Sequence, residues 1–305
     1  MQRLRNLPSS KRACCVLFKL RAALCTILLC LSPALLAPAL LAQSDAAASG
    51  VDILAAKTLG PIDYVEIDKA SEFGRDKQLI IFVHGTPGSY TTFRSYLDDP
   101  VMQARFHMIS VTRPGWRHDD DPKIASLEQQ AAALTPLLDM DRSGKGAILM
   151  GHSYGGPVIA RTAMNYPDKV AGLAFVATTA DPQLSGPRWY NRIAVVLPRF
   201  ILGARLKGAN AEILPLKPQL EEMLPLWEHV SVPVLIVQGD EDRLVHPGNA
   251  LFMRDMLLNA DVRFLQREGL GHFVLWQESE LIRDKLVALF ASDSDGAEAI
   301  STSAN

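Results

Sequence analysis

Cysteine is absent from residues 43 to 305 of this 305-residue chain. That part of the protein therefore holds no disulfide, no thiol nucleophile and no cysteine-ligated metal site. A cysteine-free domain is compatible with an oxidising compartment. All four cysteines lie near the amino terminus, at Cys14, Cys15, Cys25 and Cys30.

An overall excess of charge is also absent, because 31 Lys and Arg residues face 33 Asp and Glu residues, for a formal net charge of −2. Nearly balanced charge argues against nucleic acid as the main partner. The balance is uneven along the chain, since residues 1–42 hold six basic residues and no acidic one. Without them, 25 basic residues face 33 acidic ones, which gives a net charge of −8.

Charge of either sign is missing from residues 22–42, which are mostly apolar and follow the basic start of the chain. A basic region, an apolar region and then small residues is the order found in an export signal. The stretch is also about 20 residues long, which is enough to span a bilayer, although Pro33 and Pro38 interrupt a continuous helix. We therefore expect residues 1–42 to be a signal peptide, or an N-terminal anchor that associates with the membrane through residues 22–42. The remainder is expected to be exported across the inner membrane, to the periplasm or outside the cell.

Beyond an Ala/Ser-rich linker at residues 43–50, short apolar runs alternate with stretches of helical composition. This alternation predicts an α/β fold over residues 51–291, with a doubly wound, mostly parallel sheet and helices on both faces. The polar residues 292–305 are expected to form a disordered tail. Strands are expected at 62–67, 79–83, 106–112, 147–150, 170–176, 234–238 and 262–266. Helices are expected near 91–97, 126–138, 157–166, 247–258 and 273–290.

Residues 181–232 break this alternation, with six prolines and no convincing strand. A segment of this length between two strands indicates a functional insertion, and we expect a helical lid over the active site. Two interpretations of its surface stay open: a solvated helical face, or a surface that receives anionic or amphiphilic esters or lies on a membrane. Its basic residues are Arg188, Arg192, Arg199, Arg205, Lys207 and Lys217.

Residues 151–156 read GHSYGG, so that Ser153 has a glycine two positions away on each side. The apolar run 147–150 precedes this motif, and the helical stretch 157–166 follows it. A strand, a sharp turn and a helix around G-x-S-x-G form the context of a nucleophile elbow. A Cβ atom at either glycine would collide with the adjoining strand or helix, so only small residues can flank the serine. The motif predicts Ser153 as a nucleophile.

Polar residues follow three other expected strands at their carboxyl ends, where reactive groups gather in an α/β sheet. A serine nucleophile needs an adjacent base, and the base needs an orienting acid. His272 follows a flexible Gly-Leu-Gly loop that can bring its imidazole to Ser153, and an acid near residue 240 can orient it. The three polar stretches are HGTPGS at 84–89, GDEDRLVHP at 239–247 and REGLGHF at 267–273.

These motifs, in the order serine, acid, histidine, resemble those of the α/β-hydrolase superfamily. The resemblance covers roughly residues 55–290. The HGTPGS and RPGW stretches look most like the subgroup that includes proline iminopeptidases, epoxide hydrolases and carbon–carbon bond hydrolases. Residues 112–117 read TRPGWR, whereas these relatives often have D-R-P-G-x-G, so the detailed shape of this loop differs while the triad is untouched.

The resemblance implies a role for each site residue. It places the acid three residues after a glycine, at Asp242, with Asp240 next and Asp181 at a position that some relatives use. It also implies an oxyanion hole made by the backbone N–H groups of Thr86 and Tyr154. Among the other histidines, His84 is expected to shape its loop by hydrogen bonding, and His152 is expected to point into the fold.

Together these residues predict a serine hydrolase that cleaves carboxylic esters through an acyl-enzyme intermediate, with a small-molecule ester or acyl substrate. Acyl transfer, carbon–carbon cleavage and amide hydrolysis by the same triad are the alternatives, and a non-catalytic binding protein on this scaffold is a remote one. An aspartate nucleophile is excluded because the elbow carries serine.

The excess of positive charge in the expected lid also argues against an aminopeptidase. An aminopeptidase needs acidic side chains near the site to hold a substrate ammonium group. The insertion offers few of them, and Glu212, Glu221 and Glu222 are expected to lie far from the site. No cofactor and no metal are expected, because the acidic stretch 118–121 is interpreted as a solvated loop and the triad needs no metal.

Overall fold

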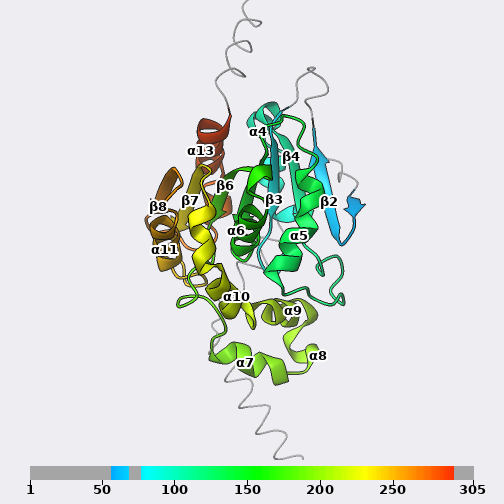
Figure 1. The fold of residues 1–305 in the computed structure, drawn as a ribbon. Helices are drawn as coiled ribbons and strands as arrows, with labels where there is room; N and C mark the ends of the chain where they lie inside the picture. Colours follow the sequence, from blue (N-terminus) through cyan, green and yellow to red (C-terminus); the bar gives the residue numbers. More distant parts are fainter. Residues whose placement is uncertain (1–55, 69–76, 292–305) are drawn as a thin grey trace, which may run out of the picture. The chain divides into compact units, whose positions relative to one another are not determined.

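The computed structural model describes residues 56–68 and 77–291, so the expected signal or anchor, the linker and the tail lie outside the described residues. Eight strands form one sheet in the order β1-β2-β4-β3-β5-β6-β7-β8 (Figure 1). β1 and β2 pair antiparallel with each other, β2 pairs antiparallel with β4, and the remaining pairs are parallel. The predicted mostly parallel sheet is confirmed. The strands are β1 (Lys57–Leu59), β2 (Ile62–Ile67), β3 (Leu79–Val83), β4 (His107–Thr112), β5 (Ala147–His152), β6 (Val170–Val176), β7 (Val234–Gly239) and β8 (Val262–Arg267).

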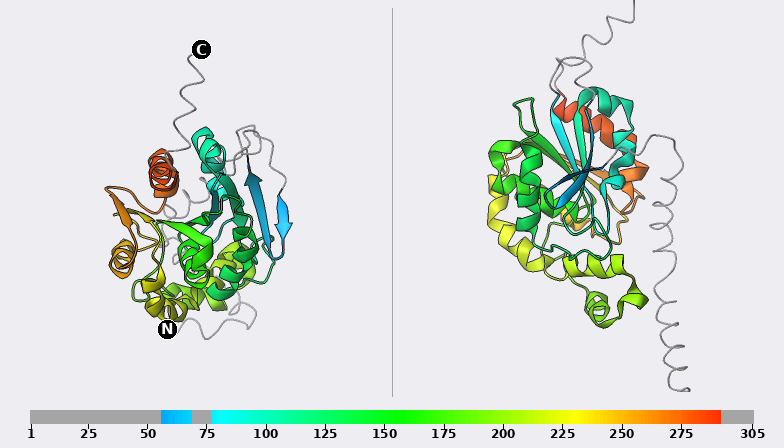
Figure 2. Two further views of the ribbon diagram at one scale, coloured as in Figure 1. Left: turned by 45° about the horizontal axis from the view of Figure 1, so that its top comes forward. Right: turned by 90° about the vertical axis from the view of Figure 1, so that its right-hand side faces the viewer.

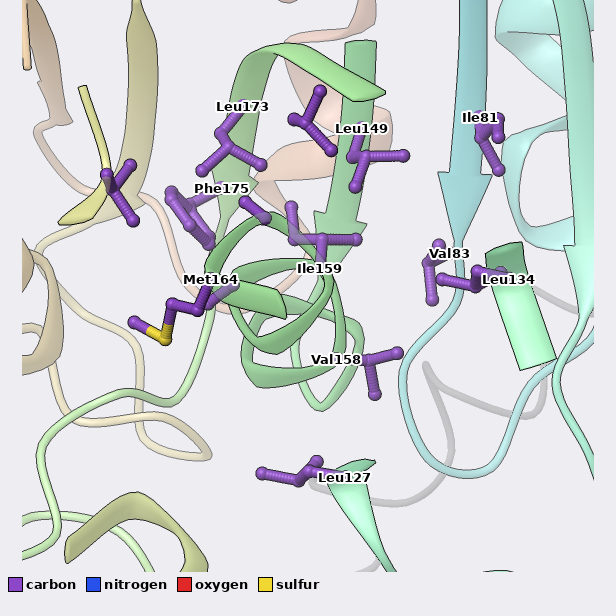
Figure 3. Close-up of a cluster of buried hydrophobic side chains, with 14 of the residues drawn as sticks. Ile81, Val83, Leu127, Leu134, Leu149, Val158, Ile159, Met164, Leu173 and Phe175 are labelled. Atoms are coloured by element: carbon purple, nitrogen blue, oxygen red, sulfur yellow. The ribbon is translucent and has the colours of Figure 1, made fainter. Parts of the chain in front are cut away.

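The central strand β3 illustrates why such runs become strands. All five of its residues are apolar and fully buried. Leu79, Ile81 and Val83 point into one apolar cluster, whereas Ile80 and Phe82 point into a second cluster on the opposite face. A parallel strand covered on both sides needs apolar residues at every position. Figure 3 shows Ile81 and Val83 in the first cluster, together with side chains of β5, β6 and α6.

Helices cover both faces of the sheet (Figure 2). The first cluster is closed by α5 (Leu127–Leu138), α6 (Gly155–Asn165) and α11 (Gly248–Met256). The second cluster is closed by α3 (Arg94–Leu97), α4 (Pro100–Arg105), α12 (Val274–Gln277) and α13 (Ser279–Phe290). A 3₁₀ segment, η4 (Tyr90–Phe93), adds Phe93 to the second cluster, and a second one, η5 (Pro167–Lys169), precedes β6 with no buried residue.

Several elements differ from the sequence-based expectation, among them the expected helix 91–97, which the structure divides into η4 and α3. The edge strand β1 was not predicted, since three largely exposed residues have no apolar alternation. The short helix α4 was also not predicted, although Pro100 at its first turn and the Asp99 side chain, which accepts hydrogen bonds from two backbone amides, are start signals. The expected helix 273–290 is divided at Glu278, whose backbone is not helical (φ −119°, ψ 31°).

The insertion between β6 and β7 is helical, as predicted. It comprises α7 (Trp189–Val196), α8 (Arg199–Leu202), α9 (Ala204–Ile213), α10 (Leu216–Met223) and η6 (Leu224–His229). In Figures 1 and 2, α7 and α8 form its outer layer, and α9 and α10 lie between them and the sheet. Within the described ranges, the structure contains no helix with both the length and the apolar character needed to cross a membrane.

Candidate active site

Ser153 lies on the sharp turn between β5 and α6, in the left-handed backbone region (φ +54°). Its N–H donates a hydrogen bond to the carbonyl of Val176 at 3.1 Å. A Cβ atom at Gly151 would lie 2.7 Å from the carbonyl oxygen of Gly155, and one at Gly155 would lie 2.1 Å from that of Val83. These approaches agree with the expectation that only small residues can flank the serine, and they restrict both positions to glycine, because real Cβ atoms do not approach backbone oxygens so closely.

His272 and Asp242 form a direct contact. The Nδ1 atom of His272 lies 2.8 Å from Oδ2 of Asp242, whose side chain is fully buried. Burial opposes ionisation of this carboxyl group, but hydrogen bonds from His272 and from the backbone amides of Val245 and Leu244 outweigh it and lower its pKa. An ionised Asp242 accepts a hydrogen bond from Nδ1–H of His272. The ring proton is thereby held on Nδ1, which leaves Nε2 without a proton and available as a base.

Asp240 and Asp181 make other contacts. Oδ1 of Asp240 accepts a hydrogen bond from the amide of Gly269 at 2.8 Å, and Oδ1 of Asp181 accepts one from the amide of Gln183 at 2.7 Å. Neither carboxylate contacts His272 in the part of the chain that the structure describes. Of the three candidate acids, the geometry therefore favours Asp242.

A cavity of about 210 Å³ lies between the predicted catalytic residues and the lid, and residues of both line it. Ser153 and His272 both line it, and no hydrogen bond joins their side chains among the described contacts. Such bonds are often long before a substrate is bound. The cavity is also lined by Thr86, Tyr154, Leu184, Arg188, Ile213, Leu216, Leu244 and Asn249.

The two predicted oxyanion donors border the same cavity. Tyr154 directly precedes α6, so its amide lies at the helix N-terminus, where the helix dipole favours negative charge. Thr86 follows β3 and is joined to Pro87 by a cis peptide bond. Among the described residues, neither amide donates a hydrogen bond to another group. Both are therefore available to an oxygen atom bound near Ser153.

His152 packs beneath His272, with ring centroids 4.9 Å apart, and its Nε2–H donates to the carbonyl oxygen of His272 at 3.3 Å. It points into the fold, as expected. Burial, followed by the nearby charge of His272, lowers the pKa of His152 to about 3. His152 is therefore a neutral support for His272.

This buried histidine predicts a specific loss of stability in acid. Below about pH 6.5 the unfolded chain protonates residue 152, whereas the folded protein does so only near pH 3. Between these values the unfolded state binds the extra proton, so stability falls as the pH falls. In the wild type, this residue lowers the free energy of unfolding by about 2 kcal/mol between pH 7 and pH 5. His152→Gln lacks the titrating group, so its free energy of unfolding is expected to fall by about 2 kcal/mol less over this range. Urea unfolding at both pH values measures this, with the exposed His229→Gln as the control; equal pH dependence in both variants would contradict the prediction.

Arg113 connects the loop after β3 to the lid. Its guanidinium donates to both carboxylate oxygens of Glu212 in α9, at 2.7 and 3.0 Å, and both side chains are almost completely buried. It also donates to the carbonyl oxygens of His84 and Gly85, at 2.9 and 2.8 Å. The Tyr154 ring packs on the guanidinium, with its centroid 4.9 Å from Cζ. Arg113 therefore ties α9 to the loop that carries Thr86.

Glu212 was expected to be distant; its carboxylate is buried in α9 against Arg113, and Glu212 is not among the residues that line the cavity. Arg113 neutralises Glu212, so the site still offers no unpaired acid from this position. The stretch 118–121 is largely exposed, as expected, and it also contacts the lid. Asp119 and Asp120 pair with the lid residues Arg205 and Arg199. The described residues contain no group of side chains arranged to hold a metal ion.

His84 shapes its loop as expected. Its Nδ1–H donates to the carbonyl of Gly85 at 2.6 Å, and its Nε2 accepts from the amide of Arg113 at 3.0 Å. Burial, and then the charge of Arg113, hold its pKa well below the usual value, so it stays neutral.

The sequence-based reasoning missed three supporting residues. Gln238 donates to Oδ2 of Asp242 at 3.1 Å. Oδ1 of Asn249 accepts hydrogen bonds from the amides of Ala180 and Asp181, both at 2.9 Å, and so fixes the start of the lid. For Arg113, the RPGW motif was a usable signal, whereas neither Gln238 nor Asn249 belongs to a local pattern.

Comparison with known proteins agrees with this architecture. The family model described as "Alpha/beta hydrolase family" matches residues 80–284. The chain is 29% identical over 129 residues to the dihydrolipoyllysine-residue acetyltransferase component of the acetoin cleaving system of Cupriavidus necator, which covers 41% of this chain and 33% of that protein. The chain spans about a third to a half of the length of the curated relatives it matches, at 33%, 46% and 32%.

Solved structures share the fold at low sequence identity. The enol-lactonase from Burkholderia xenovorans LB400 superposes with a TM-score of 0.61 at 14% identity, over 77% of this chain and 98% of that one. A thermophilic esterase from Thermogutta terrifontis gives a TM-score of 0.59 at 19% identity, over 79% and 97% of the two chains. At these identities the likeness concerns the fold alone.

Proposed function

The chain belongs to the alpha/beta hydrolase family, and from this premise we propose that it is a serine hydrolase that cleaves carboxylic esters through an acyl-enzyme intermediate on Ser153. The family supports hydrolase activity on small-molecule substrates. The observation that carries the finer proposal is the 2.8 Å contact between His272 and Asp242 beside a cavity that Ser153 also lines.

The proposed reaction follows from this geometry. Nε2 of His272 takes the proton of Ser153 Oγ as that oxygen attacks the ester carbonyl carbon, and Asp242 stabilises the resulting imidazolium. The amides of Thr86 and Tyr154 donate hydrogen bonds to the oxyanion. Collapse of the tetrahedral intermediate breaks the ester C–O bond, and His272 returns its proton to the leaving alcohol. Water then attacks the acyl-enzyme by the same steps, which releases the acid and free Ser153.

The volume of the cavity limits the size of the acyl group that it can hold. Its volume of about 210 Å³ is somewhat larger than a cavity of roughly 150 Å³ that holds benzene. Leu184, Ile213, Leu216 and Leu244 supply apolar surface. We therefore propose short to medium acyl groups, so that activity on a series of nitrophenyl esters should decline once the chain exceeds the cavity.

The nucleophile is tested by covalent labelling. A fluorophosphonate probe is expected to label the wild-type protein and to leave Ser153→Ala unlabelled, because only an activated serine attacks phosphorus readily. Ser185→Ala is the matched control, since Ser185 lines the same cavity but donates its hydroxyl proton to Asn249 at 2.8 Å. Labelling that persists in folded Ser153→Ala would remove the proposal. An added alcohol acceptor, with both products measured, separates hydrolysis from acyl transfer.

We also propose that residues 1–42 direct export, with the hydrolase domain in the periplasm or outside the cell. The support is the order of charge and apolar character in the sequence. Basic residues before the apolar stretch tend to remain cytoplasmic, which places the carboxyl end across the membrane. A reporter active only in the periplasm, fused after residue 305, should be active, and its silence would overturn this proposal.

A further inference from the structure

The outer helices of the lid expose an apolar face, here called the lid face, made of Trp189, Ile193, Val196 and Phe200. Their exposed fractions are 69%, 47%, 78% and 88%. Three of these side chains belong to α7, and Phe200 belongs to the next helix, α8. A group of large apolar side chains with this much exposure indicates an interaction surface.

Helical spacing explains why these side chains gather. Residues 189, 193 and 196 follow the i, i+4, i+7 pattern and so share one side of α7. The opposite side of α7 is fixed to α9 by the buried Asn191, which donates to Oδ1 of Asn210 at 2.8 Å and accepts from Nδ2 of Asn210 at its backbone carbonyl, at 3.0 Å. The three α7 side chains of the lid face therefore point away from α9. Both α7 and α8 lie in the outer layer of the lid (Figure 1).

Basic residues predominate on the helices that carry the lid face. Residues 182–211 contain five basic residues and no acidic one, although the chain without residues 1–42 is negative overall. Arg199 and Arg205 pair with Asp120 and Asp119. Within the described ranges, Arg188 and Arg192 form no ion pair. Arg192 is three residues after Trp189 and four before Val196, so it lies on the lid face itself.

We propose that the lid face docks on an anionic lipid surface. Apolar side chains of α7 and α8 would enter the boundary between headgroups and acyl chains, while Arg192 pairs with lipid phosphate. Tryptophan is favoured at such an interface. A second copy of the chain fits less well, because a two-fold contact on this face would bring like charges together. Asn191, on the side of α7 opposite the lid face, lines the cavity, so α7 would lie between the cavity and the docked lipid.

The fluorescence of Trp189 tests this proposal in the full-length protein. Vesicles of phosphatidylcholine with phosphatidylglycerol are expected to shift its emission to the blue, and brominated acyl chains are expected to quench it. Phosphatidylcholine alone should have a weaker effect, and high salt should reduce the response because it screens exposed charges. Subtracting the spectrum of Trp189→Phe isolates this residue from Trp116, Trp227 and Trp276.

Two variants separate the lid face from other apolar surface. The double variant Val196→Ser/Phe200→Ser is expected to need a vesicle concentration about tenfold higher or more for half of the Trp189 response. It removes two apolar side chains that would be buried in the lipid. Leu258→Ser, at a residue 79% exposed beyond α11, is the control and should respond like the wild type.

Two results would overturn the proposal. Protein that sediments with vesicles while Trp189 emission stays unchanged would assign membrane binding to residues 22–42. Emission that changes with protein concentration and not with vesicles would assign the lid face to a second copy of the chain. Both readouts use the wild-type fold, and neither depends on ester hydrolysis.

Discussion

Asp242→Asn is expected to lower kcat/KM for an activated ester by about 10⁴-fold, the loss that follows when a histidine is held in the wrong tautomer. Oδ2 of Asp242 accepts a hydrogen bond from Nδ1–H of His272 at 2.8 Å. An asparagine amide would donate to Nδ1 instead, which moves the ring proton to Nε2 and removes the base. The side chain is fully buried, so water cannot replace the carboxylate.

Asp240→Asn is the matched control, because it makes the same chemical change two residues away. Its carboxylate accepts from the amide of Gly269 and does not contact His272. It is expected to stay within about tenfold of the wild type, or about 1.4 kcal/mol of barrier. Asp181→Asn is measured beside it. A severe loss in Asp181→Asn with little change in Asp242→Asn would contradict the assignment of the acid.

Glu212→Ala is expected to lower the free energy of unfolding by about 3–5 kcal/mol, the usual cost of leaving one charge of a buried ion pair without its partner. Glu212 is fully buried and binds Arg113 through both oxygens. It also accepts from Nε1 of Trp116 at 2.9 Å. Urea unfolding at pH 7 measures the change. Glu222→Ala, at an exposed glutamate on α10, is the control and should change stability by no more than about 0.5 kcal/mol.

A second variant separates loss of charge from loss of packing. Arg113→Met/Glu212→Leu replaces both charges with apolar side chains, and such replacements often recover the stability of the native pair. We expect it to be more stable than Glu212→Ala. Its kcat/KM should still be reduced, because it lacks the hydrogen bonds from Arg113 to the carbonyls of His84 and Gly85. Wild-type stability in Glu212→Ala would contradict the proposed role of the pair.

The strand positions could be predicted closely from the sequence, because burial on both faces of a parallel sheet requires short apolar runs that end at turn residues. β2, β3 and β6 have the predicted bounds, and the other predicted strands differ by one or two residues at an end. The elbow was also predictable, since its glycines are required by the close approach of backbone atoms from the same turn and from the neighbouring strand. Ser153 and His272 were identifiable because each sits in a local motif.

Local patterns could not choose among the carboxylates, because that choice depends on how a loop 30 residues away in the chain approaches them. The contact between His272 and Asp242 exists only after β7 and β8 pair. The same reason applies to Arg113 and Glu212, which are separated by 99 residues. The sequence alone also does not distinguish the covered side of α7 from its bare side, since Asn191 meets Asn210 only when α9 packs against α7. Sequence thus determined the elements and the reactive residue types, whereas long-range packing decided which side chains meet and which apolar face stays exposed.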